Sequence, residues 1–321
     1  MRAMQVTAYD TPLEMREVEL PIPGPGEVLV RVETCGMNFG DTLMIKGTYQ
    51  EKPPLPFTVG MELAGMVEGL GEGVTGLTKG QRVAAYAGVG GLAEYAAIPA
   101  DICVPIPDEM SAIDAAAFLI AYGTSHVALD YKARMQPGER LLVLGASGGV
   151  GLTAVELGKV MGAEVIACAR GKDKLEICRV AGADHLIDSE TDDIREIVKA
   201  LGGADVVYDP VGGDQFKAAL RACNPEARLL PLGFASGEVP QIPANILLVK
   251  NLTVMGLYWG AYAKLDPKVL TDSFRVLFDW YVEGKLKPHV SNVLPLAQAN
   301  DALDLLRTRQ ATGKVVVEVQ K

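Results

Sequence analysis

A glycine-rich turn between an apolar strand and a helix constrains the fold of this chain more than any other feature. Residues 141–144 are all apolar, a Gly-Ala-Ser-Gly-Gly-Val-Gly turn follows at 145–151, and a helical pattern runs from about 150 to 161. Glycine lets a backbone approach a pyrophosphate without a Cβ clash. A tight turn without a ligand has the same local sequence, but the apolar strand at 164–168 supplies the context of a dinucleotide site.

The turn departs from the usual fingerprint at one position, because Ala146 stands where the first glycine is usual. The helix that follows offers free N–H groups and the positive end of its dipole to an anion. We expect the pyrophosphate of a dinucleotide to contact Ala146, Ser147, Gly148, Gly149, Val150 and Gly151.

The residues after the second strand indicate which dinucleotide binds. An acidic residue there would hold the ribose 2′-hydroxyl of NAD, but Ala169 occupies this position and Arg170 follows. Arginine can hold a phosphate with two parallel hydrogen bonds, and Lys172 and Lys174 add charge nearby. These cations could also be solvated residues at a helix start. The combination favours NADPH, with Arg170 and Lys174 at its 2′-phosphate.

Strands and helices alternate along the chain from near residue 123 onward. Strand candidates lie at 140–144, 164–168, 184–187, 205–209, 227–232 and 252–257, with helices at about 150–161, 173–181, 192–201 and 213–222. Apolar strands separated by helices form a parallel sheet, and right-handed crossovers make it doubly wound. We therefore predict an α/β fold with a Rossmann domain over residues 123–264.

The rest of the chain is predicted to be mostly β. Short strands near 28–32, 61–69, 81–86 and 92–98 are bounded by glycines, which is typical of a barrel-like domain. Helices near 267–283 and 297–308 and an apolar strand at 314–319 end the chain, and this strand could rejoin the first domain. The prediction is a mostly-β domain over 1–122, completed by 265–321.

Composition limits the partners and the compartment. The net charge of −10 argues against nucleic acid, which requires a basic face, and no polybasic segment suits a membrane surface. The longest apolar run, 115–122, is too short to span a membrane, and the first residues lack a secretory pattern. The five cysteines are scattered and odd in number, so we interpret them as reduced thiols of a cytoplasmic protein.

Several motifs occur in a specific order along nearly the whole chain. They lie at residues 23–28, 36–41, 60–65, 80–83, 91–95, 121–124, 145–151, 209–213 and 313–316. In this order they resemble the medium-chain dehydrogenase/reductase superfamily, and within it the zinc-independent, zeta-crystallin-like NADPH:quinone oxidoreductases. The resemblance implies a GroES-like catalytic domain from both chain ends and a central Rossmann domain.

The resemblance also implies that the catalytic zinc ligands of related alcohol dehydrogenases are missing. Their first Cys matches Asn38, their His matches Met61, and their later Cys falls at 119–121, where the chain has none. Zinc requires thiolate, imidazole or carboxylate ligands, and Glu62 alone cannot hold the ion. The lobe with four cysteines that holds a structural zinc is absent too. We predict no metal, and hence an acceptor that takes hydride without a Lewis acid.

We expect an apolar acceptor site between the domains, with few polar groups. Asn38 takes the vacated metal position, where its amide could hold the nicotinamide ribose or the acceptor oxygen, or could satisfy loop backbone groups. Asp41 is a candidate in the same segment, although a cap or loop clamp is favoured over a catalytic base. Tyr49 matches a pocket tyrosine of the resembling enzymes and could donate to an oxyanion, whereas a second such tyrosine is Leu43 here.

Three further segments are candidates for the nicotinamide half of the cofactor. Gly233 and Phe234 follow a strand at the carboxyl edge of the sheet, where doubly wound folds bind ligands. Thr124 opens the Rossmann domain and could contact the nicotinamide. Tyr258 and Trp259 could wall the nicotinamide or form a packed patch of the core.

The predicted activity is hydride transfer from NADPH to a quinone or another conjugated carbonyl. Two alternatives stay open: an enoyl-thioester or alkenal reductase on the same scaffold, and a NADPH-binding protein without catalysis. The apolar strand at 252–257 would be exposed at a sheet edge, and pairing with its copy would cover it. We therefore expect a homodimer, which the resemblance implies as well.

Overall fold

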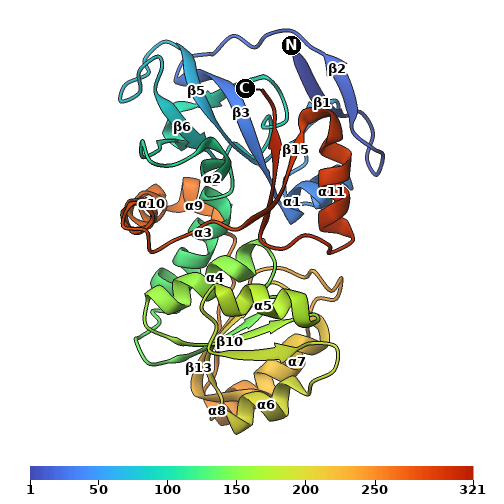
Figure 1. The fold of residues 1–321 in the computed structure, drawn as a ribbon, viewed down its shortest axis with the longest axis vertical. Coiled ribbons are helices and arrows are strands. Elements are labelled where there is room, and N and C mark those ends of the chain that lie inside the picture. The colour runs from blue at the N-terminus through green and yellow to red at the C-terminus, as the bar shows by residue number, and fades with distance from the viewer. Residues whose placement is uncertain (321) are drawn as a thin grey trace. The chain divides into compact units, whose positions relative to one another are not determined.

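The computed structural model describes residues 1–320, which divide into two units. In the first unit, strands from both ends of the chain share one sheet. Unit 1 takes in residues 1–120 and the chain from residue 287 on, and unit 2 takes in residues 121–286. Figure 1 shows the red C-terminal segment beside the blue strand β3 (Glu27–Met37). Strand β16 (Lys314–Glu318) pairs antiparallel with β3, so the C-terminal strand rejoins the first domain as predicted.

Unit 1 has the mostly-β character that the sequence predicts. Its larger sheet has seven strands in the order β15-β16-β3-β5-β6-β8, with β7 also paired to β3, and β2, β1 and β4 form a smaller sheet. Every second residue of β3 from Val28 to Val32 is fully buried, the period of a strand with one face on a core. Its other elements are β1 (Arg2–Val6), β2 (Glu14–Glu17), α1 (Phe39–Ile45), β4 (Phe57–Thr58), β5 (Glu62–Leu70), β6 (Arg82–Ala85), β7 (Tyr95–Pro99), β8 (Cys103–Pro105), α2 (Ala112–Ala116), β15 (Val290–Pro295) and α11 (Ala299–Arg307).

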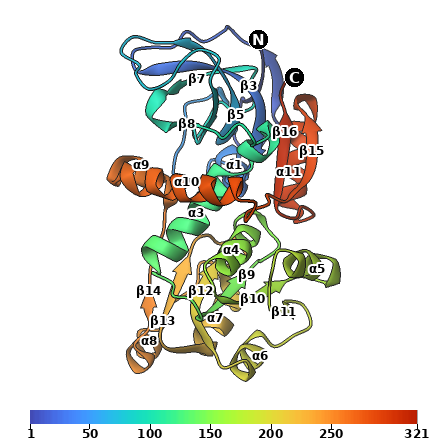
Figure 2. The same ribbon diagram turned by 60° about the vertical axis from the view of Figure 1, so that its left-hand side comes forward.

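Unit 2 is a doubly wound domain, as predicted. Its six parallel strands follow the order β11-β10-β9-β12-β13-β14, which Figure 2 shows across the sheet. The strand order turns back at β9 and β12, the place where such folds bind ligands. The elements are α3 (Leu119–His126), a π-helical continuation (Val127–Lys132), β9 (Arg140–Leu144), α4 (Gly149–Val160), β10 (Glu164–Ala169), α5 (Lys172–Val180), β11 (His185–Asp188), α6 (Ile194–Ala200), β12 (Ala204–Asp209), α7 (Gly213–Ala222), β13 (Cys223–Pro231), α8 (Ala244–Lys250), β14 (Thr253–Val254), α9 (Tyr262–Leu265) and α10 (Pro267–Val282).

Helix α10 lies in unit 2, whereas the sequence analysis placed residues 265–321 with the first domain. Its ring of Phe274 meets that of Trp259 edge-on at 6.1 Å, and its Ser273 hydroxyl lies 3.0 Å from His126 Nδ1. The sequence shows an apolar helix face, but not which unit that face covers. Among residues 1–320 we find no helix with the length and apolar character needed to cross a membrane.

The outer strand β14 is much shorter than the predicted strand at 252–257. Only Thr253 and Val254 pair with β13, after which the chain leaves the ladder. The preceding helix α8, which the sequence analysis did not predict, exposes Leu248 and Val249. The edge position of this segment is as predicted, but its length is not.

Candidate functional site

The glycine turn of unit 2 brings two backbone segments closer than any side chain would allow. A Cβ built on Gly151 would lie 2.2 Å from the carbonyl oxygen of Gly145, which itself has a φ of +59°. Helix α4 begins directly after Gly148 in the chain, and its first intrahelical hydrogen bond runs from Leu152 N to Gly148 O. The N–H groups of residues 149–151 precede that bond, so they are free to face an anion.

Three loops meet at the carboxyl edge of the parallel strands. The side chain of Val211, after β12, lies 2.8 Å from where a Cβ of Gly145 would stand. The loop after β13 bonds to the same segment, since Ala235 N donates to Pro210 O at 3.1 Å and Ser236 N to Val211 O at 2.9 Å. The predicted residues of the turn and of the Gly233 loop are therefore brought together at this edge.

Asp209 holds the loop after β12. Its Oδ1 accepts hydrogen bonds from Val211 N at 2.8 Å and Gly212 N at 2.9 Å. Its Oδ2 is buried and has no hydrogen-bond partner among residues 1–320. Burial raises the pKa of the Asp209 carboxyl, and the two backbone bonds oppose that rise.

A buried group of hydroxyls, which the sequence analysis missed, fixes the start of α4 against α3. The Ser125 hydroxyl lies 2.8 Å from both Thr153 Oγ1 and Tyr208 OH, and it donates to Val150 O at 2.9 Å. Thr124, a predicted nicotinamide contact, is the neighbour of Ser125 on α3. Hydroxyl residues on three separate elements carry no shared sequence signal, so only the fold reveals the group.

The cationic residues predicted to bind a 2′-phosphate lie at the end of β10 and the start of α5. Arg170 Nε is 3.1 Å from Glu190 Oε1, and both side chains are about half exposed. Lys172 and Lys174 lie in the first turn of α5. An exposed pair of this kind contributes about 0–1 kcal/mol, so a dianionic phosphate could replace Glu190.

The aromatic candidates of unit 2 divide into exposed and packed residues. Phe234 and Tyr258 are 43% and 40% exposed. Trp259 is only 6% exposed, and its indole would lie 2.8 Å from a Cβ on Gly123. Trp259 also contacts the Phe274 ring of α10. These two contacts favour a packing role for Trp259 over a role in lining the nicotinamide site.

His126 and the cysteines have structural surroundings. The imidazole of His126 is buried against Ser273 and meets the Trp280 ring edge-on at 5.5 Å. All five cysteines are free and buried, and burial raises the pKa of the Cys103, Cys168, Cys178 and Cys223 thiols to about 12. Burial also raises the pKa of the Cys35 thiol well above its ordinary value. A thiol with a raised pKa is a poor nucleophile, so no cysteine here is suited to covalent catalysis.

In unit 1, Asp41 clamps two segments of the predicted acceptor site. Its Oδ2 accepts from the backbone N–H of Asn38 at 2.7 Å, and its Oδ1 accepts from that of Met61 at 3.1 Å. Asp41 is completely buried, and this burial raises its pKa to about 7 against the opposing hydrogen bonds and the charge of Lys314. The geometry is that of a loop clamp.

A buried cation, absent from the sequence prediction, lies between Asn38 and Glu62. Lys314 Nζ donates to Asn38 Oδ1 at 2.7 Å and to Glu62 Oε1 at 2.5 Å, and the lysine is only 4% exposed. The Asn38 amide nitrogen donates to the same Glu62 oxygen at 3.0 Å. The signal that could have revealed it is a lysine followed by three valines in an apolar strand.

Tyr49 and Met61 complete this part of unit 1. A Cβ on Gly40 would lie 2.7 Å from Met61 Sδ and 3.4 Å from the Tyr49 ring, so both side chains converge on Gly40. Unit 1 thus gathers Asn38, Asp41 and Tyr49, the three predicted acceptor-site residues, around one short segment.

The residues at the matched zinc positions do not fit zinc. Asn38 and Met61 supply no thiolate or imidazole, and the one carboxylate, Glu62, already accepts bonds from Lys314, Asn38 and Ile120 N. Within residues 1–320 no group of three or more His, Cys, Asp or Glu side chains is placed to hold a metal ion.

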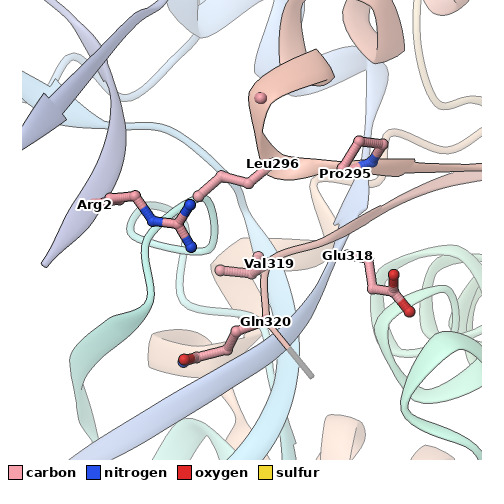
Figure 3. Close-up of a pocket in the computed structure, with 7 residues that line it drawn as sticks. Arg2, Pro295, Leu296, Glu318, Val319 and Gln320 are labelled. Atoms are coloured by element: carbon pink, nitrogen blue, oxygen red, sulfur yellow. The ribbon is translucent and has the colours of Figure 1, made fainter.

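A separate cavity of about 230 Å³ lies in unit 1 (Figure 3). It is lined by Arg2, Pro295, Leu296, Ala297, Glu318, Val319 and Gln320. The Arg2 guanidinium is paired with Glu94 at 2.8 Å. No predicted site residue lines this cavity, so it is distinct from the cluster around Asn38.

Comparison with known proteins identifies relatives along the whole chain. Residues 24–108 match the family described as alcohol dehydrogenase GroES-like domain, and residues 149–275 match the family described as zinc-binding dehydrogenase. The chain is 44% identical over 304 residues to quinone oxidoreductase-like protein 2 homolog of Nematostella vectensis, covering 93% of this chain and 83% of that protein.

Solved structures give the same picture. The Escherichia coli quinone oxidoreductase complexed with NADPH superposes with a TM-score of 0.94 at 28% identity, covering 99% of this chain and 100% of the other. The quinone oxidoreductase from Thermus thermophilus, also solved as a complex with NADPH, has a TM-score of 0.88 at 33% identity, with 99% and 100% covered.

Proposed function

We propose that this chain, which belongs to the quinone oxidoreductase family of the medium-chain dehydrogenase/reductase superfamily, reduces a quinone or another conjugated carbonyl with NADPH and without a catalytic metal. The observation that carries the proposal is the approach of Gly151 to the carbonyl of Gly145. Glycine inside a helix lowers its stability, so Gly151 is explained by the close packing of α4 on this turn, which is the role of the last glycine in a dinucleotide-binding turn. The relatives solved with NADPH support the choice of cofactor.

NADPH would supply a hydride from C4 of its nicotinamide ring. The N–H groups of residues 147–151 and the dipole of α4 would hold its pyrophosphate. Arg170 and Lys174 would hold the 2′-phosphate, which would displace Glu190 from its exposed pair with Arg170. Thr124, Gly233, Phe234 and Tyr258 are the residues we assign to the nicotinamide half.

The acceptor would bind beside Asn38 and Tyr49. The Glu62 carboxylate already accepts hydrogen bonds from Lys314, Asn38 and the backbone N–H of Ile120. Because this carboxylate is engaged, these bonds support a reaction without zinc. A quinone or an α,β-unsaturated carbonyl suits this setting, because conjugation spreads the incoming charge without a Lewis acid. The proton would come from water or from the hydroxyl of Tyr49. An enoyl-thioester or alkenal reductase is the second candidate, since these acceptors share the conjugated carbonyl.

The decisive experiment follows NADPH oxidation with 1,4-benzoquinone, a 2-alkenal and acryloyl-CoA in parallel, on protein whose zinc content has been measured. The proposal expects turnover of the quinone that survives dialysis against a chelator. Preference for the alkenal or for acryloyl-CoA would establish the second candidate. NADPH binding without turnover of any acceptor would refute an enzymatic role, and stoichiometric zinc would refute the metal-free reaction.

We also propose a homodimer through the β14 edge and a cytoplasmic location. The exposed Leu248 and Val249 of α8 precede that edge and support a covered surface. Light scattering on the eluting protein should give about twice the chain mass of 34.1 kDa. A monomer at micromolar concentration would contradict the dimer.

A further inference from the structure

We propose that Lys314 is a positioning residue that fixes the side chain of Asn38 as a hydrogen-bond acceptor for a hydroxyl-bearing ligand. The hydrogen bonds of the Asn38 amide determine which of its atoms can contact a ligand. A primary amide has two N–H donors and an oxygen with two lone pairs. Asn38 Nδ2 donates to Gly36 O at 3.2 Å and to Glu62 Oε1 at 3.0 Å, which uses both donors.

Lys314 sets the direction of this amide. Its ammonium donates to Asn38 Oδ1 at 2.7 Å, which takes one lone pair of that oxygen. A flipped amide would point its NH₂ group at the ammonium and its oxygen at the Glu62 carboxylate, so both contacts would become repulsive. The Asn38 side chain also caps α1 over the backbone N–H of Asp41 but forms no cap hydrogen bond there, so the hydrogen-bonding capacity left on this amide among residues 1–320 is the second lone pair of Oδ1.

This outcome changes the role that the sequence suggests for Asn38. An amide without a spare N–H cannot donate to the carbonyl oxygen of an acceptor. It can accept from a hydroxyl, the group that a ribose carries. Resting on the proposed function, the inference assigns Asn38 to the ribose of the nicotinamide half rather than to the oxygen of the quinone.

The cluster is built to hold this arrangement. Glu62 is 1% exposed and Lys314 4% exposed, so neither charge is screened by water. The second Glu62 oxygen accepts from Ile120 N at 3.0 Å, which fixes the carboxylate from its other side. Lys314 comes from β16, whose pairing with β3 brings the C-terminal strand next to the segment that ends at Asn38. Three segments far apart in the sequence thus determine one amide orientation.

The test must separate positioning from stability, because Lys314→Met alone leaves the Glu62 charge buried and unpaired. The double variant Glu62→Gln/Lys314→Met removes both charges and keeps similar side-chain lengths. We expect it to fold, with kcat/KM for NADPH at saturating 1,4-benzoquinone reduced about tenfold, equivalent to the loss of one polar contact. In an Asn38→Ala background the same two changes should alter kcat/KM less than about twofold.

Two outcomes would overturn the inference. One is wild-type kcat/KM in the double variant, and the other is an equal tenfold loss in the Asn38→Ala background. A second readout needs no turnover: the Asn38 side-chain amide, assigned in ¹⁵N-labelled protein by its absence in Asn38→Ala, should exchange its protons slowly in the wild type and rapidly in the double variant. Equal exchange rates would also overturn it. A wild-type protein that reduces no acceptor would refute the proposed function alone, and this amide measurement would still decide the role of Lys314.

Discussion

Gly151 lies so close to the carbonyl oxygen of Gly145 that a Cβ on Gly151 would stand 2.2 Å from it. Because the obstacle is backbone, Gly151→Ala must displace the turn itself. We expect a loss of about 1–3 kcal/mol in the free energy of unfolding and at least about a tenfold loss of NADPH affinity. Urea unfolding and a fluorescence titration measure the two effects.

Gly148→Ala is the matched control for the stability effect of that variant. Gly148 has a φ of −80°, which any residue can adopt. A Cβ built on it would meet no atom closer than Gly145 O, at 3.4 Å. Its free energy of unfolding should therefore change by less than about 1 kcal/mol. Wild-type stability and affinity in Gly151→Ala would show that the turn does not require glycine there.

Arg170→Glu should discriminate between the two nicotinamide coenzymes. A charge-assisted bond to phosphate is worth about 1.5–3 kcal/mol, so the Kd for NADPH should rise by about tenfold to a hundredfold while that for NADH changes little. Arg179→Glu is the control, since Arg179 lies at the other end of α5 and pairs with Glu176. Equal weakening of both coenzymes would exclude a 2′-phosphate contact for Arg170.

His126 should make the protein less stable in mild acid. Burial lowers the pKa of the imidazole from its ordinary value of 6.5, so the unfolded chain binds this proton more readily than the folded one. Its contribution to the free energy of unfolding is present above pH 6.5 and is lost as the pH falls below that value. Urea midpoints between about pH 5 and 7.5 should fall less steeply for His126→Asn than for the wild type, and parallel curves would contradict the assignment.

Replacing the buried carboxyl of Asp209 by an amide, in Asp209→Asn, should cost little free energy of unfolding. Asparagine keeps one oxygen for Val211 N and Gly212 N and removes a carboxyl whose pKa burial raises. A raised pKa means that the folded state binds the proton more tightly, so this carboxyl lowers the free energy of unfolding as the pH rises above about 4.

We therefore expect Asp209→Asn to be within about 1 kcal/mol of the wild type at neutral pH, or more stable. Asp209→Ala should lose about 2–4 kcal/mol, because it leaves two backbone N–H groups without their acceptor. Denaturant unfolding measures both variants. An Asn variant as unstable as the Ala variant would show that the carboxylate charge itself is needed.

Local patterns were enough to predict most of the strands and helices of unit 2. Strands β9, β10 and β12 each contain a run of apolar residues followed by a turn and a helix, so the sequence pattern locates them to within a few residues. Helix α8 was missed, and β14 was predicted too long, because a sheet edge needs few residues and sets no clear period. The assignment of α10 to unit 2 depends on its contacts with Trp259 and His126, which the helix sequence does not encode.

The sequence by itself determined the glycine turn, the alternation of strands and helices in unit 2 and the cationic residues after β10, because each depends on residue types and their spacing along one stretch of the chain. Only the tertiary structure decided that Lys314 joins Asn38 and Glu62, that Asp41 clamps two loops, and that Ser125 binds the start of α4. The physical reason is that a buried polar group must find its partner wherever the fold places one. That partner often lies far away along the chain, as Lys314 does from Asn38 at a separation of 276 residues.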